Sequence, residues 1–131
     1  MKWTSILLFF LGWSFVSCQS SSQNDTNTEQ FIREVVSVDR FKKLMAEYPD
    51  AQIIDVRTPE EFAAGHLDGA QNINFYDDDF EEQLKKLDKK KTVLVYCKSG
   101  GRSGKASNKM LSMEFNRVYD LEGGYTAWST R

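Results

Sequence analysis

The pattern of apolar and polar positions changes repeatedly between strand-like and helix-like along the chain from residue 33 onward. Short apolar or β-branched runs predict five strands at 33–37, 52–56, 70–74, 92–96 and 117–119. The run at 92–96 is the clearest of these. Apolar stripes and helix-start signals predict helices at 40–48, from 58 to the glycine at 65, at 77–87, at 103–113 and at 125–129.

Two of the predicted helices have recognisable start signals. Asp39 is expected to cap the helix at 40–48. Thr58 precedes Pro59 and two glutamates, which is the order expected for a cap, a first helical residue and an acidic first turn. Because these helices alternate with the strands, the chain is predicted to be an α/β protein with a five-stranded parallel sheet and helices on both faces.

The first eighteen residues have a different character. Lys2 precedes an apolar run of about eleven residues, which is too short to span a bilayer and typical of a signal peptide. Cys18 follows directly, and the pattern resembles a bacterial lipoprotein signal, in which this cysteine becomes lipid-modified. Ordinary cleavage near Cys18 is the alternative, because Phe15 and Ser17 stand where that signal prefers Leu and Gly or Ala.

The domain organisation follows from this pattern. Residues 1–17 are expected to be a signal peptide, 18–30 a flexible polar tether, and 31–131 the folded domain. The protein is therefore expected to be exported to the bacterial cell envelope, the periplasm, and to contact a membrane only through a lipid anchor at Cys18.

Composition excludes several classes of protein. The 131 residues suit one folded domain. The net charge of -2 lacks the basic excess of a typical nucleic-acid-binding protein. Two cysteines cannot form a disulfide scaffold, and a single histidine excludes a multi-histidine metal site. No metal or cofactor is expected.

The candidate chemistry lies in the loop after the clearest strand, because parallel sheets bind ligands at the carboxyl ends of their strands. There the chain continues as Cys97, Lys98, Ser99, Gly100, Gly101, Arg102 and Ser103. Two glycines allow a tight loop with inward N–H groups, and the following helix adds positive potential at its N-terminus. Such surroundings lower a thiol pKa from about 8.5 to roughly 3.5–7.5. A buried structural cysteine before a glycine turn is the alternative, but it does not explain the basic residues.

Three segments resemble the rhodanese family of sulfurtransferases, over about residues 35–128. The matching motifs are at 54–62 with 65–70 and 72–73, at 97–103, and at 121–128. The resemblance implies a rhodanese-like fold and a mechanism in which Cys97 takes sulfane sulfur from thiosulfate or a similar small anionic donor. A thiophilic acceptor, cyanide or a thiol, would then collect the sulfur from the Cys97 persulfide.

The resemblance also assigns roles to other residues. The backbone N–H groups of residues 98–103 would hold the anionic sulfur, and Arg102 would close the loop and bind a sulfonate group. Asp55 and Arg57 would brace the loop, the alternative being a surface ion pair worth about 0–1 kcal/mol. His66 is expected to make a structural hydrogen bond, with a role as proton donor as the alternative.

Other functions remain open. A persulfide-carrier or protein-interaction module would have the same loop but little turnover of small donors. Phosphatases and arsenate reductases of similar fold need five residues between cysteine and arginine, whereas four lie between Cys97 and Arg102. These two activities are therefore disfavoured. The sequence leaves the oligomeric state and the physiological donor and acceptor undetermined.

Overall fold

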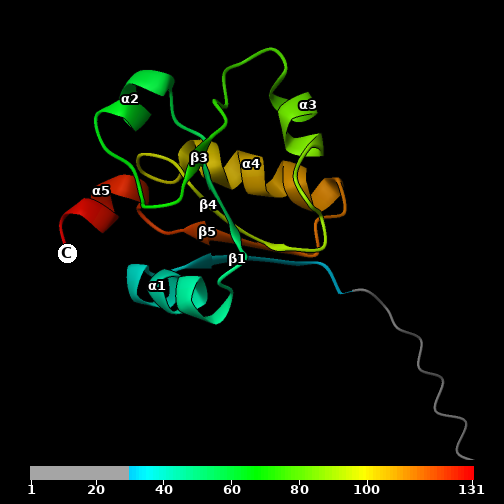
Figure 1. The fold of residues 1–131 in the computed structure, drawn as a ribbon, viewed down its shortest axis with the longest axis horizontal. Helices are drawn as coiled ribbons and strands as arrows, with labels where there is room; N and C mark the ends of the chain where they lie inside the picture. The colour runs from blue at the N-terminus through cyan, green and yellow to red at the C-terminus, as the bar shows by residue number, and fades with distance from the viewer. Residues whose placement is uncertain (1–29) are drawn as a thin grey trace, which may run out of the picture.

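The computed structural model describes residues 30–131, which contain one sheet of five parallel strands (Figure 1). The spatial order of the strands is β1-β5-β4-β2-β3. Their bounds are β1 Ile32–Val36, β2 Gln52–Asp55, β3 Gln71–Asn72, β4 Thr92–Tyr96 and β5 Arg117–Leu121. The predicted α/β fold with a five-stranded parallel sheet is confirmed. The predicted strand at 70–74 is shorter than expected, because only Gln71 and Asn72 pair with β2.

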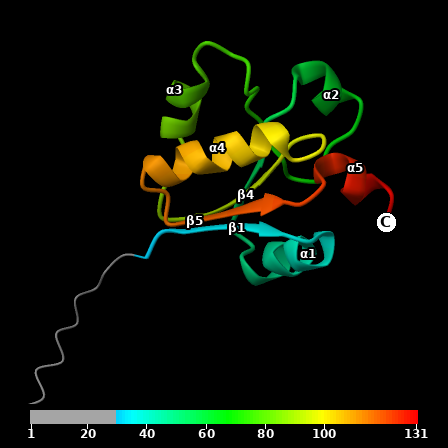
Figure 2. The ribbon, with the colours of Figure 1, turned by 180° about the vertical axis from the view of Figure 1, so that it is seen from behind.

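Helices cover both faces of this sheet, as the two opposite views show (Figures 1 and 2). Their bounds are α1 Val38–Glu47, α2 Pro59–Ala63, α3 Phe80–Lys85, α4 Gly101–Ser112 and α5 Gly124–Ser129. Residues of α3 and α4 pack in one core cluster, and residues of α1 and α5 contribute to the other. Within residues 30–131, no helix has both the length and the apolar character that crossing a membrane requires.

The central strand β4 contributes side chains to both core clusters. All five of its residues are buried, and it pairs with β2 on one side and β5 on the other. Since side chains alternate along a strand, Val93 and Val95 belong to the cluster under α3 and α4, whereas Leu94 and Tyr96 belong to the cluster under α1. Cys97 follows Val93 and Val95 in this alternation, and its side chain therefore lies on the face of the sheet covered by α4.

The helix starts differ in part from the prediction. The expected cap at Asp39 is wrong, because α1 begins at Val38 and the Ser37 hydroxyl accepts the N–H of Arg40 at 3.3 Å. Burial of Val38 in the core draws the helix start toward the N-terminus. At α2 the prediction holds: Thr58 and Glu61 form a reciprocal capping box, and Pro59 is the first helical residue.

The predicted signal peptide at 1–17, Cys18 and all but the last residue of the predicted tether lie outside the described residues. The described chain begins with Gln30, which is exposed, and enters the sheet directly through β1.

The position of β4 generates a stability prediction. Val93→Ala removes two methyl groups from a fully buried site and should lower the free energy of unfolding by about 2 kcal/mol. The same substitution at Val35, a β1 side chain that is 48% exposed, should change it by no more than about 0.5 kcal/mol. Urea denaturation of both variants measures the difference. Equal effects of the two substitutions would show that β4 is not the centre of the core.

Candidate active site

Cys97 lies at the carboxyl end of β4 and is only 1% exposed. Its Sγ accepts two hydrogen bonds from the loop that follows, one from the Gly100 N–H at 3.0 Å and one from the Ser103 hydroxyl at 3.3 Å. The residues after the strand therefore bend back over the sulfur instead of leaving the sheet. This curvature is possible because Gly100 has a φ of +113°, in a region that L side chains rarely adopt.

The loop stabilises the thiolate against an unfavourable environment. Burial raises the pKa of Cys97, because a charge is costly away from water. Hydrogen bonds from the Ser103 hydroxyl and from the N–H groups of Ser103, Gly100 and Ser99 lower that pKa, and together they outweigh burial. The pKa of Cys97 therefore lies below its ordinary value. Of the predicted cradle at 98–103, these three residues supply the amides that act on the sulfur.

The first residues of α5 hydrogen-bond the carbonyl groups at the beginning of the Cys97 loop. The N–H groups of Tyr125 and Thr126 donate to the carbonyl oxygens of Cys97 and Lys98, at 2.8 and 3.0 Å. These bonds turn the carbonyls away from the sulfur. Gly124 makes this contact possible, because a Cβ at this position would collide with the Cys97 carbonyl and its φ is +57°. The two-glycine turn thus fixes α5 directly against the loop.

Asp55 and Arg57 form a buried ion pair at the end of β2, with Arg57 Nη2 2.7 Å from Asp55 Oδ2. Their side chains are 0% and 4% exposed, so the alternative of a surface ion pair is wrong. Arg57 also donates to the Gly65 carbonyl at 2.6 Å, and its guanidinium lies 4.3 Å from the centre of the Tyr125 ring. Through Tyr125, whose N–H holds the Cys97 carbonyl, the pair reaches the loop indirectly.

Arg102 forms an ion pair with Glu61 of α2. Nη1 and Nη2 of Arg102 donate to the two carboxylate oxygens of Glu61 at 2.7 and 3.0 Å. The bonds from Arg102 are the main cause that lowers the pKa of Glu61 to about 2. The guanidinium also lies 5.6 Å from the centre of the exposed Tyr76 ring. In this structure the side chain predicted to bind a sulfonate is engaged by a carboxylate.

Glu61 is a residue of this site that the sequence pattern indicates only as part of a helix start. Two features of the sequence mark Glu61 as a candidate: it lies in the 54–62 motif, and it occupies the third helical position of the capping box. Its partner could not be inferred, because Arg102 is 41 residues away in the chain.

The remaining candidates lie at the periphery of the loop. His66 is exposed, its Nδ1 is 2.9 Å from the Phe62 carbonyl oxygen, and its ring stacks on Phe62. This arrangement is the structural hydrogen bond expected for it. The side chain of Lys98 is exposed. Within residues 30–131, no cluster of three or more His, Cys, Asp or Glu side chains could hold a metal ion.

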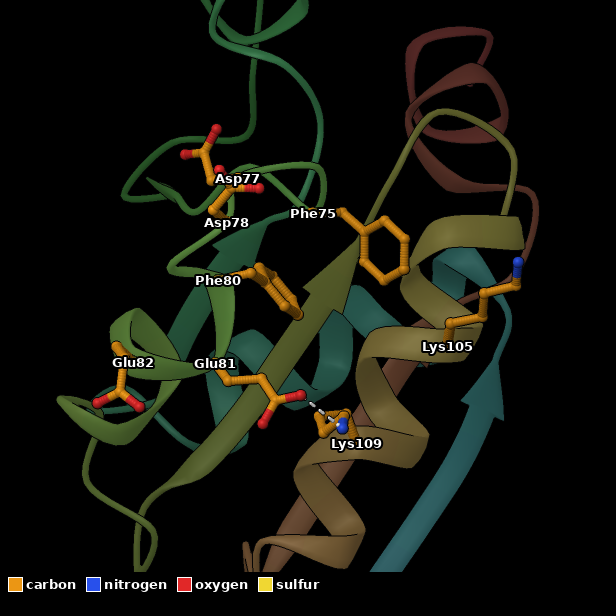
Figure 3. Close-up of a pocket in the computed structure, with 8 residues that line it drawn as sticks. All are labelled: Phe75, Asp77, Asp78, Phe80, Glu81, Glu82, Lys105 and Lys109. Atoms are coloured by element: carbon orange, nitrogen blue, oxygen red, sulfur yellow. Dashed lines mark ion pairs between the residues drawn. The ribbon is translucent and has the colours of Figure 1, made fainter.

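Two surface pockets flank this region. The smaller, of about 250 Å³, is lined by Arg57, Glu61, Ala64, Lys98, Tyr125, Thr126 and Ser129. The larger, of about 490 Å³, lies between α4 and the segment from Phe75 through the first turn of α3 (Figure 3). Its walls carry opposite charges, with Lys105 and Lys109 on α4 facing four carboxylates, and Lys109 pairs with Glu81 at 2.7 Å.

The Glu61–Arg102 pair generates a prediction about pH. Glu61→Gln keeps a side chain that can complete the capping box but removes the charge, and should destabilise the fold by about 1 kcal/mol at pH 7. Because the folded-state pKa of Glu61 is lowered from 4.5 to about 2, this stabilisation is complete above pH 4.5 and is lost as pH falls toward 2.

Urea denaturation between pH 7 and pH 2 measures the difference between wild type and Glu61→Gln. Glu60→Gln is the matched control, since Glu60 is the exposed neighbour in the same helical turn. A difference that stays constant as the pH is lowered would contradict the ion pair.

Comparison with known proteins agrees with this geometry. Residues 37–131 match the family described as "Rhodanese-like domain". Thiosulfate sulfurtransferase 16, chloroplastic, from Arabidopsis thaliana is 41% identical over 86 residues, covering 58% of this chain and 72% of that protein. Thiosulfate sulfurtransferase GlpE from Shewanella oneidensis is 33% identical over 84 residues, covering 64% of this chain and 81% of the relative.

Solved structures show the same similarity. A rhodanese-like domain protein from Staphylococcus aureus has a TM-score of 0.64 and 29% identity, with 72% of this chain and 90% of that chain covered. A human single-domain sulfurtransferase has a TM-score of 0.61 and 25% identity, with 74% and 96% covered. The family match spans most of the chain and includes every residue described around Cys97. The chain belongs to the rhodanese-like domain family, whose relatives include sulfurtransferases.

Proposed function

We propose that the domain is a sulfurtransferase that moves sulfane sulfur from thiosulfate or a similar donor to a thiophilic acceptor through a persulfide on Cys97. The observation that carries this proposal is the hydrogen bonding of Cys97 Sγ by the Gly100 amide and the Ser103 hydroxyl. These donors favour the anionic form of the sulfur, which is the nucleophile. Relatives at 33% and 41% identity that are named thiosulfate sulfurtransferases support the reaction class.

The proposed reaction has two displacement steps. The Cys97 thiolate attacks the outer sulfur of thiosulfate, a bond forms between the two sulfurs, and the sulfur–sulfur bond of thiosulfate breaks. Sulfite leaves with the electron pair, and Cys97 holds a persulfide anion. The acceptor, cyanide or a thiolate, then attacks the terminal sulfur of this persulfide, and the Cys97 thiolate is released. No net oxidant is needed, and the enzyme alternates between two covalent states.

The loop stabilises charge throughout this cycle. Amides already oriented toward a sulfur anion need no rearrangement as negative charge moves from Cys97 Sγ to the next sulfur and back. The bonds from Tyr125 and Thr126 keep the loop carbonyls facing away from that charge. The exposed ammonium group of Lys98 adds positive potential at the smaller pocket.

A persulfide carrier is the second candidate function, and the position of Arg102 favours it. A small sulfonate donor is bound best by a guanidinium with free N–H groups, whereas both Nη atoms of Arg102 are bound by Glu61. A carrier that accepts sulfur from a partner protein would need the amide cradle but not this cation.

Activity with thiosulfate and cyanide tests the first function. Wild-type protein should form thiocyanate, and Cys97→Ala should abolish it, because the variant has no sulfur to carry the persulfide. Ser112→Ala is the control, since this exposed hydroxyl at the far end of α4 donates to the Lys109 carbonyl. Its rate should equal that of wild type. Thiocyanate formation no greater than in Cys97→Ala would contradict thiosulfate:cyanide transfer.

The carrier would then be distinguished by mass. An adduct of about 32 Da, one sulfur atom, on Cys97 without thiocyanate formation favours the carrier. Absence of both the adduct and thiocyanate would contradict persulfide chemistry altogether.

We also propose that the protein acts at the bacterial cell envelope, anchored through a lipid on Cys18. The support is the order of a basic residue, a short apolar run and Cys18 in the first eighteen residues. Intact-mass measurement of protein isolated from cell membranes should show loss of residues 1–17 and an acyl-chain mass on Cys18. An unmodified Cys18 on protein cleaved nearby would support ordinary secretion instead. Replacing Cys18 by Ala should release the protein from the membrane.

A further inference from the structure

Asp120 is a buried carboxylate that the proposed mechanism does not use. It lies near the end of β5, where it pairs in register with Val95 of β4. It is only 2% exposed, and its Oδ1 has no hydrogen-bond partner. A carboxylate oxygen buried without a partner is costly, so the presence of Asp120 on the strand next to that of the reactive cysteine calls for a physical explanation.

Arg33 of β1 compensates this carboxylate only in part. Arg33 Nη2 is 3.9 Å from Asp120 Oδ2, beyond hydrogen-bonding distance. The same guanidinium donates instead to the Ser107 hydroxyl at 3.0 Å and to the Gly104 carbonyl at 3.5 Å. Burial is the largest influence on Asp120 and raises its pKa, against smaller lowering effects from the Ser103 hydroxyl and Arg33.

Ser103 connects this carboxylate to the reactive sulfur. It is fully buried in the first turn of α4, and its hydroxyl lies 3.3 Å from Cys97 Sγ. The next residue of α4, Gly104, packs against Asp120, since a Cβ at Gly104 would lie 3.8 Å from Asp120 Oδ2. The Ser103 hydroxyl also lowers the pKa of the Asp120 carboxyl. A hydroxyl carries one proton to donate, so the sulfur, the Gly100 carbonyl at 3.4 Å and Asp120 compete for it.

We propose that Asp120 is a positioning residue that acts through Ser103 to set the proton affinity of the Cys97 sulfur. When Asp120 is ionised, it attracts the Ser103 proton and its negative charge opposes the thiolate. When Asp120 is protonated, it can donate to the Ser103 oxygen, and the Ser103 proton stays directed at the sulfur. This inference rests on the proposed function only in taking Cys97 as the reactive group.

The charged side chains that act on Asp120 and Cys97 come from β1 and α4. Within residues 30–131, Arg33 from β1 is the charged side chain that acts on Asp120, while α4 presents Ser103, Ser107 and the Gly104 backbone to this cluster. Arg102, also on α4, is electrostatically coupled to Cys97. Since the two acids share one donor, their ionisations are coupled, and forming the sulfur anion favours protonation of Asp120.

The test is the pH dependence of Cys97 alkylation by iodoacetamide in the full chain. Mass spectrometry of the Cys97 peptide reads this reaction separately from Cys18. Asp120→Asn removes the charge without changing the shape and can donate its amide proton to the Ser103 oxygen. The midpoint of the alkylation profile should fall by roughly half a unit to one unit. Asp68→Asn, at an exposed carboxylate, should leave the midpoint unchanged.

A double-variant comparison tests the route through Ser103. In a Ser103→Ala background, the effect of Asp120→Asn on the midpoint should shrink to less than half. An unchanged or raised midpoint in Asp120→Asn, or an undiminished shift in the Ser103→Ala background, would overturn the proposal. If Asp120→Asn does not fold, Asp120→Ser removes the same charge and carries the same expectation.

The result is independent of the proposed function, because alkylation needs no sulfur donor. A protein that forms no thiocyanate but shows the shift would support the role of Asp120 and contradict only the transfer reaction. An active sulfurtransferase without the shift would contradict only the role of Asp120.

Discussion

The hydrogen bonds from the loop to Cys97 Sγ are the interaction on which the site depends. A sulfur that is 1% exposed would ordinarily hold its proton tightly, because its anion would lose the solvation of water. Here the donors are the amides of Ser99, Gly100 and Ser103 and one hydroxyl, and their combined effect reverses that of burial. The reactivity of the cysteine therefore follows from backbone geometry, and every surrounding element has to preserve that geometry.

The fold supplies this constraint from three directions. β4 is buried along its whole length and fixes the point at which the loop begins. α4 fixes where the loop ends, since its first turn is closed by the Gly104 N–H on the Gly100 carbonyl at 3.0 Å. α5 holds the outward carbonyls, and a side chain at Gly124 would separate it from the loop. Because both ends of the loop and its outward carbonyl groups are held in place, the loop amides face the sulfur.

The sequence predicts the parts of this arrangement that depend on local signals. The strand at 92–96, the glycines of the loop and the capping box at Thr58 are each encoded within a few neighbouring residues, and the structure has all three. The predicted helix cap at Asp39 is wrong because Ser37 also favours a cap, and the burial of Val38 decides between the two positions.

The long-range pairs could not be predicted in the same way. The pairs Glu61 with Arg102 and Arg33 with Asp120 join residues that the fold brings together and the chain order keeps apart. Exposed and buried carboxylates look alike in a sequence. Asp120 follows a strand-like run as a polar residue would at a strand end, and nothing local shows that α4 covers it.

These pairs also explain why the amides dominate the electrostatics of the site. The two arginines nearest the loop are both committed, Arg102 to Glu61 and Arg57 to Asp55, so their positive charges are largely offset by their partners. Asp120 on the neighbouring strand β5 is a buried carboxyl group that Arg33 approaches only to 3.9 Å. Because the charges of both arginines are offset, the N–H dipoles and the Ser103 hydroxyl supply the main stabilisation of the anion. A site built in this way can pass charge between successive sulfurs without moving a side chain, which is the property that repeated sulfur transfer requires.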